Sequence, residues 1–128
     1  MQEWQKQLSG SVVRVEDLPF LPDSIEYRKK LKKVAEIFPI RINSYFLSQI
    51  KNENDPLWKQ VVPTLEELDD IIDEESLLVS DPLNEEVDMP VPELVHRYPD
   101  RVLLMVNNQC PIICRFCTRK RKIGFPGI

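Results

Sequence analysis

Several residue types are scarce in this chain of 128 residues, and each shortage narrows the expected class of protein. No apolar run is long enough to cross a membrane and the N-terminus does not resemble a secretory signal, so we expect a cytoplasmic protein without a membrane partner. The three cysteines are an odd number, which argues against a disulfide framework. Glycine also occurs only three times, fewer than the βα turns of a complete α/β barrel would use. We therefore expect the front piece of a larger protein.

Basic residues are absent from one long stretch and concentrated in the next. From Gln60 to His96 there are twelve Asp or Glu and no Lys or Arg, whereas Arg97 to Lys122 has seven Lys or Arg and one acid. This polarity is hidden by the net charge of −4. Because the basic end coincides with all three cysteines, we expect it to serve anionic ligands there rather than nucleic acid.

Capping and proline signals predict a mainly helical region ahead of residue 80. Several expected starts carry a capping signal, with Asn43 or Ser44 before the third helix and a Thr64–Glu67 capping box before the last, and Gly10, Pro39 and Pro63 mark expected ends. The expected ranges are 1–9, about 23–38, 44–50, 57–62, and a helix that begins after Thr64 and includes Ile71 and Ile72. Ser80 to Glu93 is expected to be loop, extended at its proline-rich end.

The most apolar run in the chain lies directly before the cysteines. Arg101 to Asn107 has no polar alternation, which predicts a strand buried on both faces, as in parallel sheets. Such a strand needs neighbours on both sides, and only Ser11 to Val15 offers another candidate. We therefore expect that its partner strands are missing from the chain.

The cysteines form a CxxxCxxC pattern of Cys110, Cys114 and Cys117 on one short loop. Structural zinc sites and ordinary cubane clusters take four protein ligands, so three thiolates leave one metal position open. The alternatives are a zinc knuckle, a disulfide, or three inert core thiols. Zinc would require a fourth ligand, and His96 is the only histidine, upstream of the apolar run.

This spacing resembles the signature of the radical S-adenosylmethionine superfamily. The resemblance implies a 4Fe-4S cluster whose open iron binds S-adenosylmethionine, from which an electron generates a 5′-deoxyadenosyl radical. Phe116 matches the aromatic residue usual before the third cysteine, and is therefore expected to be a cofactor-binding residue.

Longer segments are similar to the lysine 2,3-aminomutase family. They are Asp55–Leu68, Pro92–Leu104 and Cys114–Arg121. The resemblance implies an enzyme that uses iron–sulfur, S-adenosylmethionine and pyridoxal phosphate to move an amino group between adjacent carbons of an amino acid. It also implies a fold class: a mainly α N-terminal region with a proline-rich connector at 1–96, and at 97–128 the first strand and cluster loop of an incomplete (β/α) partial barrel.

The resemblance assigns roles to particular residues. Cys110, Cys114 and Cys117 are expected to ligate the cluster. Arg119 matches an arginine that grips the substrate carboxylate, for which a planar guanidinium is suited; alternatively it is part of a solvated basic tail. The residues that resemble the lining of the pyridoxal phosphate site are Arg97, Tyr98 and Arg101. A structural pairing of these arginines with the acidic region remains the alternative.

The expected partners are an amino acid, with lysine as the first expectation, and a reductant such as flavodoxin or ferredoxin. The resemblance also leaves room for a homo-oligomer. Arginine, glutamate and a protein-bound lysine stay open as substrates, because the discriminating acids, like the pyridoxal lysine, would lie beyond Ile128. We therefore do not expect this chain alone to be a competent mutase.

Some positions depart from the family pattern. Phe116 replaces a common histidine, Glu93 stands where glycine is usual, and Gly124 to Ile128 diverges where a first barrel helix is expected. Two other functions remain open: a small metal-binding interaction module with a basic C-terminal tail, and an inactive remnant.

Overall fold

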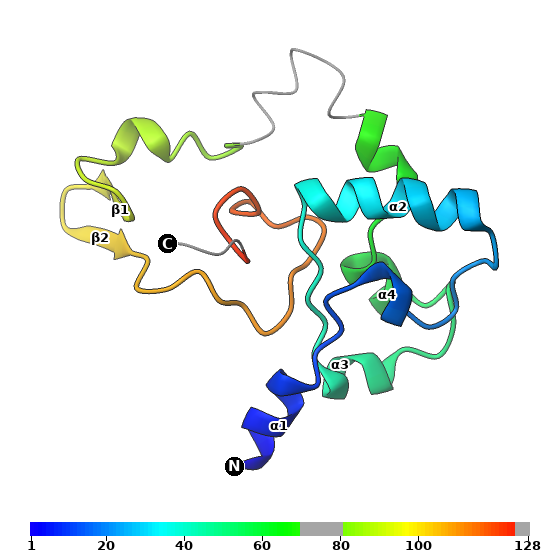
Figure 1. Ribbon diagram of the computed structural model, residues 1–128. Helices are drawn as coiled ribbons and strands as arrows, with labels where there is room; N and C mark the ends of the chain where they lie inside the picture. The colour runs from blue at the N-terminus through cyan, green and yellow to red at the C-terminus, as the bar shows by residue number, and fades with distance from the viewer. Residues whose placement is uncertain (70–80, 125–128) are drawn as a thin grey trace.

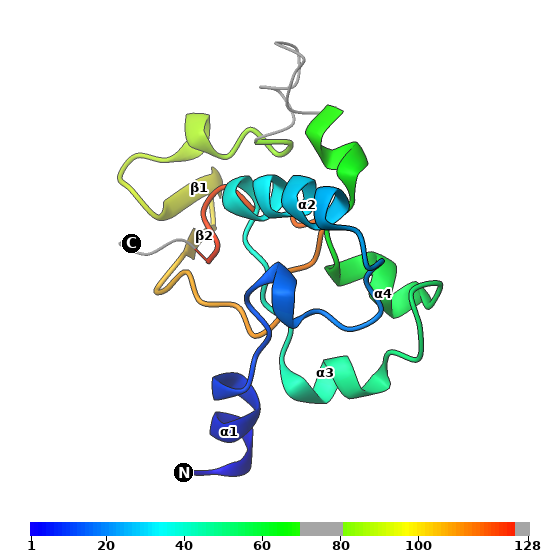
Figure 2. The ribbon, with the colours of Figure 1, turned by 45° about the vertical axis from the view of Figure 1, so that its right-hand side comes forward.

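The structure, a computed structural model, describes residues 1–69 and 81–124. Its helical elements are α1 (Glu3–Ser9), η1 (Val15–Asp17), α2 (Ile25–Ile37), α3 (Ser44–Gln49), α4 (Pro56–Val61), η2 (Leu65–Leu68) and η4 (Glu86–Asp88). They are followed by the strands β1 (Leu94–Tyr98) and β2 (Arg101–Leu104). The helices α2, α3 and α4 lie on one side of the molecule and the hairpin on the other, with the C-terminal loop between α2 and the hairpin (Figure 1). The same arrangement is visible after rotation (Figure 2).

The helix boundaries follow local capping chemistry, and the predicted helical N-terminal region is confirmed. α1 ends at Gly10, and α3 begins where the Asn43 side chain accepts a hydrogen bond from the Phe46 N–H at 2.8 Å. Asp55 caps α4 in the same way. The expected start of α2 near Asp23 is slightly early, because Ser24 is the residue that caps it. The expected residues Ile71 and Ile72 of the next helix lie outside the described residues.

The core of the helical region is an apolar cluster built from η1, α2, α4 and the segments that connect the helices. Its buried members are Val15, Leu18, Leu31, Ile40, Ile42, Ile50, Trp58, Val61 and Val62. Ile42 stands at its centre in an extended segment, where it forms antiparallel bridges with Val12 on one side and with Ile112 on the other. The loop that carries the cysteines is therefore joined to the helical core by backbone pairing.

The prediction of a strand buried on both faces is wrong. β2 pairs antiparallel with β1, with Leu94 opposite Leu104 and Tyr98 opposite Arg101, and every residue of β2 is exposed. The two strands form an open sheet, without a further strand among the described residues. The sequence did contain a signal for this hairpin, since Pro99-Asp100 between two apolar runs is typical of a turn. Hydrophobicity identified the strand, but its burial depends on neighbours that the described residues do not supply.

No helix within residues 1–69 and 81–124 is long and apolar enough to cross a membrane.

Candidate functional site

The cysteine loop is fixed to the helical core by the residues between its first two cysteines. Ile113 is buried, and its N–H donates to the Arg41 carbonyl at 2.8 Å. Ile112 packs against the core cluster and bridges Ile42. Because Ile112 packs on the core and Ile113 is buried, the loop is anchored between Cys110 and Cys114.

All three cysteines are free and partly exposed. The Cys110 thiol donates a hydrogen bond to the Ile112 carbonyl at 2.9 Å, and the Cys117 N–H donates to the Cys114 carbonyl at 3.2 Å. Burial raises the pKa of the Cys114 thiol above its ordinary value, and the neighbouring Cys117 and Cys110 raise it further. Across the described part of the chain, however, no three Cys, His, Asp or Glu side chains are grouped to hold a metal ion. In this arrangement the three thiols do not form a metal site, and the Cys110 sulfur would no longer donate to the Ile112 carbonyl once it bound a metal as a thiolate.

Arg115, between the second and third cysteines, was not singled out by the sequence. Its Nε and Nη2 donate to the two carboxylate oxygens of Glu67 at 3.0 and 2.7 Å, and its Nη1 reaches the carbonyls of Phe38 and Pro39. Its backbone N–H donates to the Gln60 carbonyl at 2.7 Å. The Arg115 and Glu67 side chains are only 9% and 15% exposed. The buried ion pair ties the loop to η2, and the bonds to the three carbonyls tie it to the ends of α2 and α4.

The structure brings four of the predicted site residues to one cavity. A cavity of about 370 Å³ is lined by residues of both strands, of the 83–85 segment and of the basic tail: Leu83, Glu85, Val95, Arg97, Tyr98, Arg101, Val102, Leu103 and Arg119. Arg97, Tyr98, Arg101 and Arg119 all belong to this lining. Phe116 does not, and its side chain points outward, 68% exposed.

Each arginine of this cavity is paired with a carboxylate of the chain itself. Arg97 Nε donates to Asp88 at 2.8 Å, and Arg101 makes a two-point pair with its neighbour Asp100 while its guanidinium lies 5.5 Å from the centre of the Tyr98 ring. The hydrogen bond to Asp88 is the main cause that raises the pKa of Arg97. The arginines that line this cavity are therefore held in place by acids and are not free positive charges.

The basic tail pairs with the acidic segment before β1. Arg119 pairs with Glu85, and Arg121 with Asp81 and Glu86. The Nζ of Lys122 lies 3.7 Å from the Glu93 carboxylate. Arg119 is therefore not part of a solvated tail, since it pairs with Glu85. Arg97 does form the structural pairing with the acidic region that was the alternative to a phosphate site, since it pairs with Asp88. The pairings of the basic tail across 29 to 40 residues of sequence could not be assigned from charge alone.

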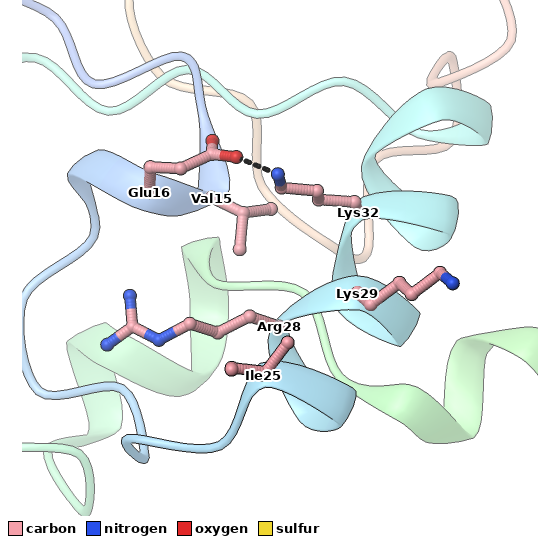
Figure 3. A pocket seen from close by; sticks show the side chains of 6 residues that line it. All are labelled: Val15, Glu16, Ile25, Arg28, Lys29 and Lys32. Carbon is pink, nitrogen blue, oxygen red and sulfur yellow. Dashed lines mark ion pairs between the residues drawn. The ribbon is translucent and has the colours of Figure 1, made fainter.

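A second cavity, of about 340 Å³, is formed by η1 and α2 and contains none of the predicted site residues. It is lined by Val15, Glu16, Ile25, Arg28, Lys29 and Lys32 (Figure 3). Glu16 and Lys32 form an ion pair across it, so part of its positive charge is neutralised.

Comparison of the sequence with known proteins places this chain in a family. No family model matches the chain. The chain is 39% identical over 125 residues to the L-lysine 2,3-aminomutase of Acetoanaerobium sticklandii. The aligned region covers 95% of this chain and 29% of that protein. It is 40% identical over 128 residues to the L-lysine 2,3-aminomutase of Methanococcus maripaludis, with the same coverage of 95% and 29%. This chain belongs to the lysine 2,3-aminomutase family. It is also 36% identical over 121 residues to the glutamate 2,3-aminomutase of Clostridioides difficile, covering 92% of this chain and 28% of that protein.

The chain spans less than a third of the length of these relatives and corresponds to an N-terminal portion of the lysine 2,3-aminomutase family. The family resemblance predicts a glycine at the position of Glu93, and the backbone there has the conformation that glycine favours. Glu93 has a φ of 66°, in the left-handed region that favours glycine, and its carbonyl accepts the Met105 N–H at 2.9 Å. This family member therefore carries a strained residue at the start of its hairpin.

Replacing Glu93 by glycine is expected to give a more stable protein than replacing it by alanine. Both variants lose the pair with Lys122, but only glycine adopts the left-handed backbone without steric cost, a difference of ~1 kcal/mol. Urea unfolding of the two variants measures this difference directly. An alanine variant at least as stable as the glycine variant would contradict it.

Gly124 is expected to be intolerant of a side chain. Its φ is 87°, its N–H donates to the Asn108 carbonyl at 2.9 Å, and an added Cβ would lie 2.7 Å from Cδ1 of the buried Ile113. Gly124→Ala should destabilise the contact between tail and loop by ~1–3 kcal/mol, through backbone strain and overpacking. Amide hydrogen exchange at Ile113 and Arg115 measures this loss. Gly10→Ala is the matched control, because Gly10 has a negative φ and an added Cβ there makes only ordinary contacts.

Proposed function

We propose that this chain is the N-terminal portion of a radical S-adenosylmethionine, pyridoxal-phosphate-dependent amino acid 2,3-aminomutase. One observation carries this proposal: Arg97, Tyr98 and Arg101 of the hairpin and Arg119 of the basic tail line a single cavity. Those are the residues that the family resemblance connects with pyridoxal phosphate and the substrate. Their convergence supports a shared site that binds two anionic groups.

Cys110, Cys114 and Cys117 would hold the 4Fe-4S cluster. The donor chemistry fits, because the three free thiols are partly exposed on one short loop, and binding would bring their sulfur atoms together. When bound, the cluster and S-adenosylmethionine supply a radical that removes a substrate hydrogen, and pyridoxal phosphate supplies an aldehyde that carries the amino group. The chain positions the thiols through Ile113 and the Arg115–Glu67 pair. Phe116, exposed beside Cys117, is the proposed contact for S-adenosylmethionine.

The cavity would hold the cofactor phosphate and the substrate carboxylate. Arg97 and Arg101 are suited to a phosphate, because guanidinium groups bind phosphate oxygens through directional charged hydrogen bonds. Arg119 would bind the carboxylate of the amino acid. The acids Asp88, Asp100 and Glu85 hold these arginines in defined orientations, which lowers the entropy that binding must remove.

The proposed division of the chain is a helical region with its connector at 1–96 and the start of a (β/α) partial barrel at 97–128. The exposed apolar side chains of β2, Val102 and Leu104, support it, because the helices that pack on the faces of such a sheet would cover them. The names of the relatives support lysine or glutamate as the amino acid substrate. A flavodoxin or ferredoxin reductant, a homo-oligomeric assembly and a cytoplasmic location are further parts of the proposal.

Anaerobic reconstitution with iron and sulfide tests the proposal. The chain should take up four iron atoms per copy, and the EPR signal of the reduced protein should change when S-adenosylmethionine is added. A variant with all three cysteines replaced by alanine is the control and should take up none. Stoichiometric zinc binding in place of a cluster would overturn the proposal.

The alternative, an interaction module whose basic tail binds RNA, has less support. Arg119 and Arg121 are engaged by buried or half-buried acids of the same chain, so the tail offers little free positive charge. Binding of a mixed-sequence RNA that weakens steeply with salt would favour the module.

A further inference from the structure

Glu85 has an unusual environment for a carboxylate. Its side chain is only 4% exposed, and its Oε1 and Oε2 accept hydrogen bonds from Arg119 Nη2 at 2.6 Å and Arg119 Nε at 3.2 Å. Arg121 Nη2 lies 3.7 Å from Oε2. A buried carboxylate is costly unless it is paired, so the chain retains Glu85 here only with its two arginines. This pairing fixes the position of the Arg119 side chain.

The pair with Glu85 uses one edge of the Arg119 guanidinium and leaves a second edge unused. A guanidinium can form a two-point pair through its Nε and Nη2 or through its Nη1 and Nη2. Glu85 takes the first edge, and Nη1 of Arg119 has no hydrogen-bond partner within residues 1–69 and 81–124. Because Arg119 also lines the cavity of about 370 Å³, its second edge can serve a ligand there.

Arg101 and Asp100 show the same pairing of Nε and Nη2 with a carboxylate, but at the surface. Their side chains are 71% and 64% exposed, so water competes for the contact. The Glu85–Arg119 pair is shielded from that competition on the Glu85 side. Arg119 is therefore held more firmly than an arginine oriented by an exposed neighbour.

We propose that Glu85 is a positioning residue that holds the Nε–Nη2 edge of Arg119, so that the Nη1 edge meets the carboxylate of an amino acid substrate. This inference rests on the proposed function, in which Arg119 binds that carboxylate. It assigns to the acidic segment before β1 a part in substrate binding. It also explains why a carboxylate is buried beside the basic tail.

The test uses the whole 128-residue chain labelled with ¹⁵N, in which the Arg119 Nε–H signal is identified by its loss in Arg119→Lys. L-Lysine and L-glutamate are titrated separately, and 1,5-diaminopentane, which lacks a carboxylate, is the ligand control. One of the amino acids should shift the Arg119 signal and the diamine should not. Glu85→Gln should weaken that binding about tenfold and speed the exchange of the Arg119 Nε–H with water. Glu85→Asp should restore part of the amino acid binding and should slow part of the exchange of the Arg119 Nε–H again.

Glu86→Gln is the matched protein control. Glu86 is mostly exposed and pairs with Arg121 rather than Arg119, so its loss should leave the Arg119 signal and the amino acid binding unchanged. Binding that depends on Arg119 but is unchanged in Glu85→Gln would overturn the inference and leave the proposed function intact. Tighter binding in Glu85→Gln would also overturn it, since Glu85 would then be a competitor for the guanidinium. If neither amino acid affects Arg119, the proposed carboxylate site itself is wrong and the inference falls with it.

Discussion

Replacing Arg115 by alanine is expected to lower the free energy of unfolding by about 3–5 kcal/mol, because it leaves the Glu67 carboxylate buried without its cation. Glu67 would keep one hydrogen bond, from the Thr64 N–H at 3.0 Å, and lose both charged contacts. The carbonyls of Phe38 and Pro39 would lose their donor as well. Urea unfolding followed by circular dichroism measures the loss.

Two further variants separate charge burial from simple loss of a contact. In Arg115→Met combined with Glu67→Leu both charges are gone, so part of the lost stability should return, while the carbonyls of Phe38 and Pro39 still lack their donor. Arg14→Ala breaks an equally well-formed two-point pair with Asp17, but at the surface, and should change stability far less. A loss in Arg115→Ala no larger than in Arg14→Ala would show that the buried pair does not stabilise the loop.

The parts of the fold that the sequence predicted correctly are those decided by neighbouring residues. Gly10 ends α1, Asn43 caps α3, and the Thr64 N–H bonds to the Glu67 carboxylate in the predicted capping box, all within a few residues of sequence. The hairpin was missed because the proline-rich stretch was interpreted as a connector, although Pro99-Asp100 is a turn signal. The burial of β2 was wrong because burial is decided by what packs on a strand.

The candidate site shows the same division. Family resemblance identified Arg97, Tyr98, Arg101 and Arg119, and the structure places them in one cavity. It gave no indication of Glu85 or of the Arg115–Glu67 pair, because their partners lie 34 and 48 residues away in the sequence. Among so many acids and bases, only the folded arrangement determines which pairs form and which are buried.

Replacing Ile42 by alanine is expected to lower the free energy of unfolding by ~2–5 kcal/mol, the usual range for isoleucine in a core. Ile42 is fully buried, and its backbone bridges both Val12 and Ile112, so a cavity at this position weakens the junction between the helical core and the cysteine loop. Ile42→Val removes one methylene group and should cost only ~0.5–1.5 kcal/mol. Ile25→Ala is the surface control, because Ile25 is 89% exposed and should change stability by less than ~0.5 kcal/mol.

The same Ile42 series reports on the loop itself through the reactivity of its thiols. If the loop depends on the core through Ile42, the rate at which Ellman's reagent modifies Cys110, Cys114 and Cys117 should rise from wild type to Ile42→Val to Ile42→Ala, in native buffer where the chain stays folded. Ile25→Ala should react like wild type. Destabilisation by Ile42→Ala without any rise in thiol reactivity would mean that the loop is held mainly by Arg115 and Glu67. The two series together therefore determine whether apolar packing or a buried ion pair sets the position of the three proposed cluster ligands.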